Sequence, residues 1–114
     1  MINFSRLLIL LIFSIIPGVL QASNAVEGIR SGIYKNGTRF VIDLEKSVEY
    51  KIFSNQNNNT IRIILPNLDW KIAKKRAFSR GSIVSYRYQN KSKISGELVL
   101  ETNKKVDVYK NFIL

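Results

Sequence analysis

Two residue types that commonly carry catalysis or bind metals are absent from this sequence. The chain of 114 residues has neither Cys nor His. It therefore lacks a thiol nucleophile, a thiolate metal site, the usual zinc ligand and the usual general base at neutral pH. Its 8 Asp and Glu residues are scattered and form no catalytic set. We therefore expect a protein that is not an enzyme and that holds no metal or cofactor.

Binding chemistry is better represented, because 18 Lys and Arg residues give the chain a formal charge of +10. Arginines on predicted strands could bind carboxylates, and tyrosines could cover sugar faces. An ordinary surface or core role is the alternative for each of these residues. The candidate ligand-binding residues are Arg39, Arg62, Arg87, Tyr34, Tyr86 and Tyr88.

A second group of cations falls within ten residues, from Lys71 to Arg80. Its apolar residues, Ile72, Ala73, Ala77 and Phe78, predict one short amphipathic turn of helix. The segment is either a solvated connection between two halves of the domain or a patch for an anionic surface. In the second case Lys74, Lys75 and Arg76 are candidate ligand contacts.

Two further residues are interpreted as structural. Trp70 is the only Trp in the chain. We expect it to close one end of the core, and a sugar-stacking platform is the alternative. Asp43 lies between Ile42 and Leu44, so we expect it to pair with a basic residue or to accept backbone N–H bonds.

The elements that must position these residues are strands. Residues 38–44 alternate between apolar and polar side chains, and Asn36-Gly37 before them is a hairpin signal. Short strands with turn signals about every ten residues indicate an all-β domain, a sandwich or barrel. The predicted strands are 28–35, 38–45, 48–53, 60–65, 81–89, 94–101 and 106–114.

A weak internal repeat accompanies this pattern. Glu97-Leu98-Val99-Leu100-Glu101 corresponds to Arg39–Asp43 at an offset of 58 residues. The same offset aligns Val106 with Val48 and Val108 with Tyr50. We therefore expect a small two-sheet β-sandwich built from two quasi-symmetric β units.

Residues 1–25 differ in character from the rest. Arg6 is their only charge, an apolar stretch runs from Leu7 to Leu20, and Ser23-Asn24-Ala25 offers a small-x-small cleavage site. This pattern predicts a signal peptide cleaved after Ala25, with Ala22 as the alternative site. A membrane anchor would need about 20 apolar residues, so we expect no membrane span after cleavage. The mature domain, 26–114, is then periplasmic, which makes nucleic acid an unsuitable partner.

The mature chain resembles the AMIN domain, the non-catalytic N-terminal module of bacterial N-acetylmuramoyl-L-alanine amidases, found also in secretin pore proteins. The resemblance covers about residues 27–114. The residues that carry it are Ile29-Arg30, Thr38–Leu44, Val48 with Tyr50, Ile61–Pro66, Asp69-Trp70, Gly81-Ser82-Ile83, Tyr86-Arg87-Tyr88, and, more loosely, Leu98–Glu101 and Phe112–Leu114.

This resemblance implies two packed β-sheets, peptidoglycan binding and delivery of a partner activity to sites of cell-wall remodelling or cell division. The sequence departs from the family at Gly96 and Glu97, where Arg followed by apolar residues is more usual. It also stops near where a zinc hydrolase domain would begin. The expected function is therefore that of a peptidoglycan-binding module, stand-alone or left from a shortened amidase. The alternative is a periplasmic adaptor that docks on envelope proteins by strand addition.

Overall fold

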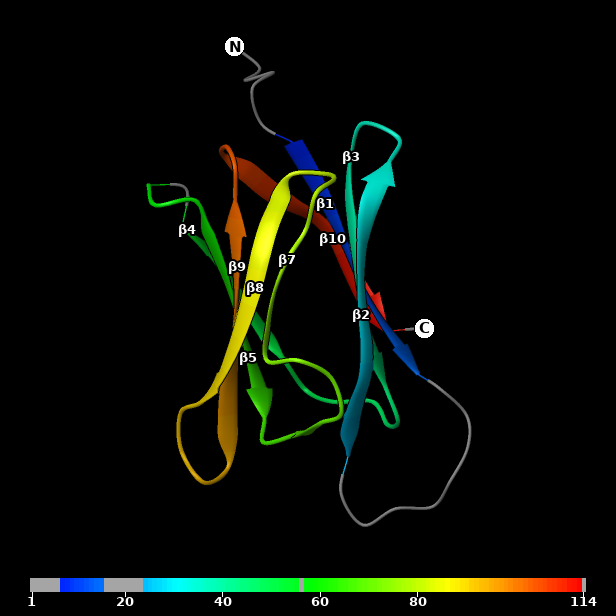
Figure 1. Cartoon of the computed structure of the whole chain (residues 1–114), viewed down its shortest axis with the longest axis vertical. Coiled ribbons are helices and arrows are strands. Elements are labelled where there is room, and N and C mark those ends of the chain that lie inside the picture. Colours follow the sequence, from blue (N-terminus) through cyan, green and yellow to red (C-terminus); the bar gives the residue numbers. More distant parts are fainter. Residues whose placement is uncertain (1–6, 16–23, 56, 114) are drawn as a thin grey trace.

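The computed structural model describes residues 7–15, 24–55 and 57–113. These residues form strands and no helix, arranged in two five-stranded sheets that face each other (Figure 1). Sheet A has the order β10-β1-β3-β2-β6, and sheet B has the order β4-β5-β9-β8-β7. The strands are β1 (Leu7–Ile15), β2 (Ala25–Tyr34), β3 (Gly37–Leu44), β4 (Lys51–Asn55), β5 (Thr60–Pro66), β6 (Asp69–Trp70), β7 (Lys75–Ala77), β8 (Ile83–Asn90), β9 (Ser95–Thr102) and β10 (Val106–Ile113). The predicted two-sheet all-β fold is confirmed.

The alternation in β3 divides its residues between two environments. Thr38, Phe40, Ile42 and Leu44 are buried between the sheets, whereas Arg39 is exposed on the outer face of sheet A. The β2–β3 turn falls on Lys35 and Asn36, one residue earlier than the sequence predicts, and Gly37 begins β3. Lys35, with a φ of 53°, takes the left-handed conformation.

The core lies between the inner faces of both sheets. Phe40 and Ile42 from sheet A and Ile63, Leu98 and Leu100 from sheet B are completely buried. Trp70 closes one edge of this core, because its ring lies 4.3 Å from that of Tyr88 and 6.1 Å from that of Tyr86.

The internal repeat extends over whole strands. Adding 58 to the bounds of β3 gives the bounds of β9, and the same offset brings β2 onto β8 and β4 onto β10. The order of strands in sheet B, β4-β5-β9-β8-β7, thus corresponds place by place to β10-β1-β3-β2-β6 in sheet A. The offset therefore relates the two sheets to each other, but each sheet mixes the two repeats, because β4 of the first lies in sheet B and β10 of the second lies in sheet A.

Two places break this correspondence. At one edge, β6 runs parallel to β2, whereas β7 runs antiparallel to β8. The other place is that of β1 and β5. β5 runs antiparallel to both of its neighbours, β4 and β9. β1 holds the matching place in sheet A and runs parallel to both β10 and β3. In the whole chain, the apolar core of the expected signal peptide is thus a strand in the middle of a sheet. The other parts of that peptide, 1–6 and 16–23, lie outside the described residues, and cleavage stays a prediction.

The segment between Lys71 and Arg80 is not helical, so that prediction is wrong. It contains β7, which pairs with the edge of β8. Backbone hydrogen bonds also join the residues on either side of β7 to β8. The N–H of Tyr88 donates to the carbonyl of Lys74 at 2.7 Å, and the N–H of Phe78 donates to the carbonyl of Val84 at 2.8 Å. An isolated helical turn orders several residues but forms few hydrogen bonds. Pairing with the existing edge of β8 is therefore favoured for so short a segment.

Candidate functional site

The outer face of sheet B brings together two of the three candidate arginines. Arg62 on β5 and Arg87 on β8 both lie opposite Val99 of β9. Because directly opposed residues share a face of the sheet, both side chains point away from the core. Arg39 lies on the outer face of sheet A, on the other side of the molecule. A single face carrying all three arginines, or Arg39 with Arg87, therefore does not exist.

Arg62 borders an open hollow at the β4 edge of this face. Phe53, Ser54, Asn55, Asn57 and Arg62 line the hollow, which has a volume of about 560 Å³. The Arg62 guanidinium lies 5.7 Å from the centre of the Phe53 ring. The Phe53 residue is 50% exposed, and the side chain of Arg62 is 47% exposed. An exposed ring, a cation and amide side chains thus converge here, which is called the Phe53–Arg62 hollow below.

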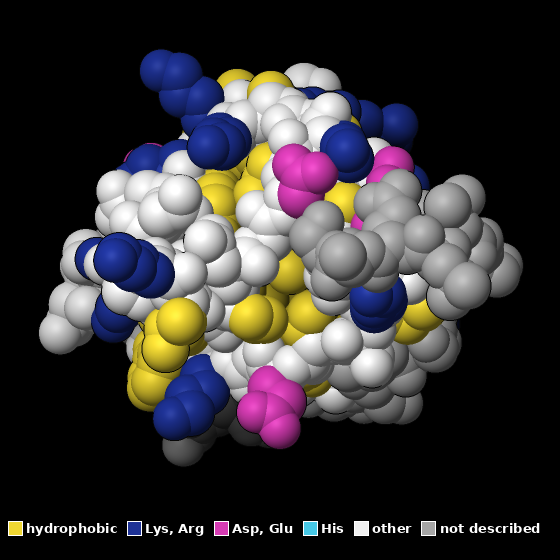
Figure 2. Space-filling view, turned by 90° about the horizontal axis from the view of Figure 1, so that it is seen from below, with side chains coloured by type: hydrophobic (Ala, Val, Ile, Leu, Met, Phe, Trp, Pro, Cys, Tyr) yellow, Lys and Arg dark blue, Asp and Glu magenta, His cyan; other side chains and the backbone are white. Residues whose placement is uncertain are grey.

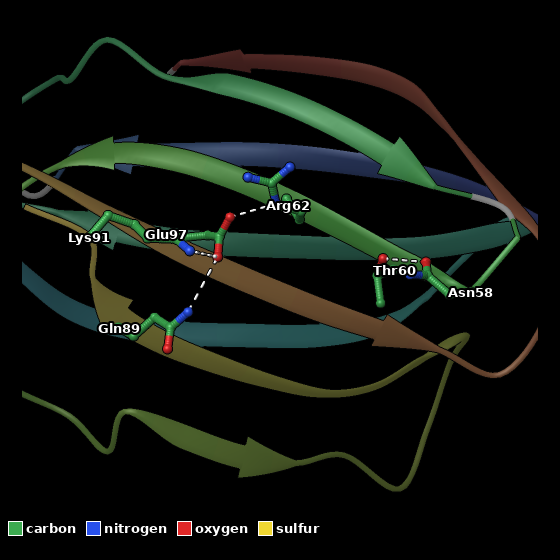
Figure 3. A network of polar contacts seen from close by, with 6 residues as sticks. All are labelled: Asn58, Thr60, Arg62, Gln89, Lys91 and Glu97. Carbon is green, nitrogen blue, oxygen red and sulfur yellow. Dashed lines mark hydrogen bonds and ion pairs between the residues drawn. The ribbon is translucent and has the colours of Figure 1, made fainter.

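The position of Arg62 is fixed by Glu97 on β9 (Figure 3). Nε of Arg62 donates to the Glu97 carboxylate at 2.5 Å, Nζ of Lys91 lies 3.4 Å from it, and Gln89 donates to it at 3.4 Å. The Glu97 side chain is only 5% exposed. Because the bond uses Nε, the two terminal nitrogens of Arg62 remain as donors for a ligand.

These contacts determine the charge state of Glu97. Burial alone would raise the pKa of its carboxyl. The hydrogen bonds and charges of Arg62 and Lys91 outweigh burial, and the net effect is a pKa below the ordinary value. Glu97 is therefore ionised at neutral pH and holds Arg62 beside Phe53.

The two departures from the AMIN pattern have structural reasons. Glu97 is the partner of Arg62, as described above. Gly96 makes room for Tyr88, because a Cβ at that position would lie 2.0 Å from the Tyr88 hydroxyl oxygen. A larger residue at Gly96 would therefore push the Tyr88 ring off its place against Trp70.

Tyr86 and Tyr88 do not act as exposed platforms. They are only 1% and 6% exposed, because both side chains of β8 point into the core. The Tyr86 hydroxyl donates to the Ala73 carbonyl at 2.6 Å. Burial raises the pKa of Tyr86, although the nearby Arg76 charge opposes this. The expectation that these two rings cover sugar faces is therefore wrong.

Tyr34 and Arg39 form a second exposed cluster, on the outer face of sheet A. Arg39 lies 5.4 Å and Lys35 lies 5.3 Å from the centre of the Tyr34 ring, which belongs to a residue that is 39% exposed. Farther along this face, Arg30 donates to Asp43 at 2.9 Å, which is the pairing expected for Asp43.

The remaining cations are dispersed. Arg87 pairs with Glu101 at 2.9 Å, with about half of each side chain exposed. Lys74 and Lys75 are exposed. Arg76 instead crosses to sheet A, where it donates to the Ile29 carbonyl at 3.3 Å, and its guanidinium lies 5.1 Å from the Phe78 ring centre. Arg76 is thus an exposed residue that also links the two sheets.

Another exposed surface is apolar. Figure 2 shows the end of the sandwich where β5 ends and β8 turns into β9, with hydrophobic side chains among Lys and Arg. A groove of about 940 Å³ lies along this end of β4 and β5, lined by Val48, Glu49, Tyr50, Lys51, Ile64, Leu65, Pro66, Ile94 and Ser95. Its few polar groups give little to orient a polar ligand.

The sequence prediction missed Phe53, Asn55 and Asn57, which line the hollow beside Arg62. A signal was present: Phe53 follows the outward Lys51 by two residues and so shares its side of the strand. The Asn-rich stretch 54–59 carried no sign of which face it borders, because only the β4–β5 pairing places it beside Arg62.

Comparison of the chain with protein-family models, with curated proteins and with solved structures found no match. Within the described residues, no group of three or more His, Cys, Asp or Glu side chains is placed to hold a metal ion. The same part of the chain contains no helix long and apolar enough to cross a membrane. The AMIN resemblance therefore rests on the sequence alone.

Proposed function

We propose that this chain is a non-catalytic peptidoglycan-binding module of the bacterial envelope, exported to the periplasm. In this proposal it is AMIN-like, either stand-alone or derived from a shortened N-acetylmuramoyl-L-alanine amidase. Its role is to target an activity to the cell wall during remodelling and division.

The observation that supports this proposal is the Phe53–Arg62 hollow. Peptidoglycan combines sugar rings with peptides that end in carboxylates. The half-exposed Phe53 ring offers an apolar surface for a sugar face, and the terminal nitrogens of Arg62 suit a carboxylate. Asn55 and Asn57 supply amide groups within the same hollow, suited to hydroxyl and peptide groups. One wall fragment could engage all three kinds of group at once.

Co-sedimentation with purified sacculi tests the proposal. Phe53→Ala and Arg62→Lys should each weaken binding by about tenfold, which corresponds to about 1.4 kcal/mol. Arg62→Lys keeps a charge near Glu97 but loses the planar fork. Tyr34→Ala and Arg39→Lys are matched controls, since they alter the aromatic–cation cluster on the opposite sheet, and they should leave binding unchanged. Equal losses from both pairs, or none from the first, would contradict the proposal.

A protein–protein adaptor is the second candidate. The observation that favours it is the position of β10, which is an edge strand of sheet A and could accept a strand from an envelope protein. Pull-down from envelope extract, compared with pull-down by sacculi, separates the two candidates. An adaptor would retain specific proteins after the sacculi have been removed.

A further inference from the structure

The place of β1 in sheet A is defined by contacts on both sides and on its inner face. β1 pairs with β3 along one edge and with β10 along the other. Its inward side chains, Ile9, Leu11 and Phe13, are at most 1% exposed. Phe13 stacks on Tyr50, with 4.1 Å between ring centres. A strand in this place therefore completes the core as well as the sheet.

Removal of the signal peptide would vacate this place. Strands in a sheet lie about 4.8 Å apart, so β3 and β10, each a neighbour of β1, are about 10 Å from each other. Both would then present backbone groups to a gap. The apolar residues Ile42, Leu44 and Val106, now buried, would border it. An exposed apolar gap with two unpaired edges is a strong template for another strand.

The quasi-symmetry indicates which strand fits. The matching place in sheet B holds β5, which is antiparallel to both neighbours. Ile61, Ile63 and Leu65 of β5 point into the core, and Arg62 points out. β1 instead runs parallel to its neighbours, and its pairing with β10 is irregular between Ile9 and Leu10. Relative to its neighbouring strands, β1 therefore runs in the opposite direction to β5.

We propose that the gap between β3 and β10 is an acceptor site for an antiparallel β-strand donated by a partner protein of the envelope. The donor is an extended segment of about seven residues, the length of β5, with Ile, Leu or Val at alternate positions and polar residues between them. The described strands from β2 to β10 already have places in the two sheets, so none of them is available as the donor. This inference rests on the export part of the proposed function, since β1 occupies the site until cleavage.

The test uses the whole chain, with a protease site replacing residues 17–22. The chain is folded first and cut afterwards, so that folding does not depend on the shortened domain. The probe is a fluorescent peptide copying residues 59–67, with lysines added at its ends for solubility. The control peptide carries Ile61→Asp and Ile63→Asp. Anisotropy measures binding, amide NMR locates it, and a spin label at the peptide N-terminus gives its direction.

We expect the uncut chain to leave the peptide unbound, and the cut chain to exchange β1 for it. The control peptide should bind at least about tenfold more weakly, because two buried side chains would become charged. Amides of β3 and β10 should shift. The spin label should broaden Leu44 rather than Gly37, since Gly37 lies at the end of β3 where a parallel strand begins.

Three results would overturn the inference. These are equal binding of both peptides, shifts confined to β4 and β9, and protection of the β3 and β10 amides after the cut β1 segment has been removed from the domain. The last result would mean that these strands pair directly and close the gap. None of these outcomes affects binding to sacculi, which is measured separately and tests the proposed function.

Discussion

Glu97 lies on the outer face of sheet B, yet its carboxylate is covered by Arg62, Lys91 and Gln89. The hydrogen bonds from Arg62 and Lys91 lower its pKa in the folded chain despite burial. In the unfolded chain the pKa returns to its ordinary value, near 4.5. As the pH falls through this region, the unfolded state therefore takes up the proton first, and the folded state loses stability.

The first prediction follows from this difference. The stabilisation by Glu97 should be complete above about pH 4.5 and should fade as the pH drops through the lowered pKa. Glu97→Gln should lower the melting temperature at pH 6 and flatten its decline between pH 6 and 3. Thermal melts of parent and variant at both pH values measure this. An acid decline as steep in the variant as in the parent would show that other carboxylates cause it.

Asp43 gives the second prediction. Its side chain is 15% exposed, whereas its partner Arg30 is 66% exposed. Because solvent screens this pair, Asp43→Ala should cost about 1 kcal/mol, the low end for losing such a partner. Urea unfolding measures the loss. An unchanged midpoint would mean that water replaces Asp43 at no cost.

At the residue scale, alternation predicted several outward side chains correctly, among them Arg39, Arg62 and Arg87. It failed for β8. Val84 shares the sequence parity of Tyr86 and Tyr88, but an irregularity in pairing between Ile83 and Ser85 leaves Ile83 buried and Val84 exposed. The sequence alone also could not show which face of β8 meets the core, because that depends on its partners.

At the scale of elements, two glycines in strands differ sharply in what surrounds them. A Cβ on Gly96 would lie 2.0 Å from the Tyr88 hydroxyl oxygen, whereas a Cβ on Gly32 would meet nothing within 4 Å. The third prediction is that Gly96→Ala costs about 1–3 kcal/mol, as overpacking usually does. Gly32→Ala, the matched control, should be neutral or slightly stabilising.

Fluorescence of Trp70 reports this change directly, because Trp70 is the single Trp and packs on Tyr88. Gly96→Ala should alter the emission of the folded protein along with its midpoint of unfolding. If both glycine variants behave like the parent, the Tyr88 ring adapts without disturbing Trp70.

The long strands were predictable, but three elements were not. β6 and β7 have only two and three residues, too few for a periodic pattern. β1 lies in an apolar run whose composition indicates a signal peptide. Its pairing with β3 and β10 depends on residues far along the chain, and local patterns carry no information about such distant partners.

At the scale of the whole molecule, charge should contribute to wall binding without specifying it. The fourth prediction is that binding to sacculi weakens as salt rises from about 50 to 300 mM, because the Debye length is about 10 Å at 0.1 M. Changing Lys74 and Lys75 to Ser should also weaken binding, with little change in stability. Arg76 is left intact because it donates to Ile29 across the sheets. Salt-independent binding would exclude an electrostatic contribution.

Export provides the fifth prediction. Mass spectrometry of protein from the native envelope should find a mature N-terminus at Val26. Cleavage after Ala22 would instead keep Asn24. The side-chain amide of Asn24 donates to the carbonyl of Lys46 and accepts from its N–H, both at 3.0 Å. The two masses distinguish these sites. An intact Met1 on a membrane-bound species would indicate an anchor.

The central claim is that the Phe53–Arg62 hollow binds peptidoglycan. The most direct test is an NMR titration of the isotope-labelled protein, isolated from the envelope, with a soluble disaccharide-peptide fragment of the wall. The account predicts saturable shifts at Phe53, Asn55 and Arg62, with Tyr34 and Arg39 unmoved. Shifts centred on Tyr34 and Arg39, or no saturable shifts at all, would contradict it.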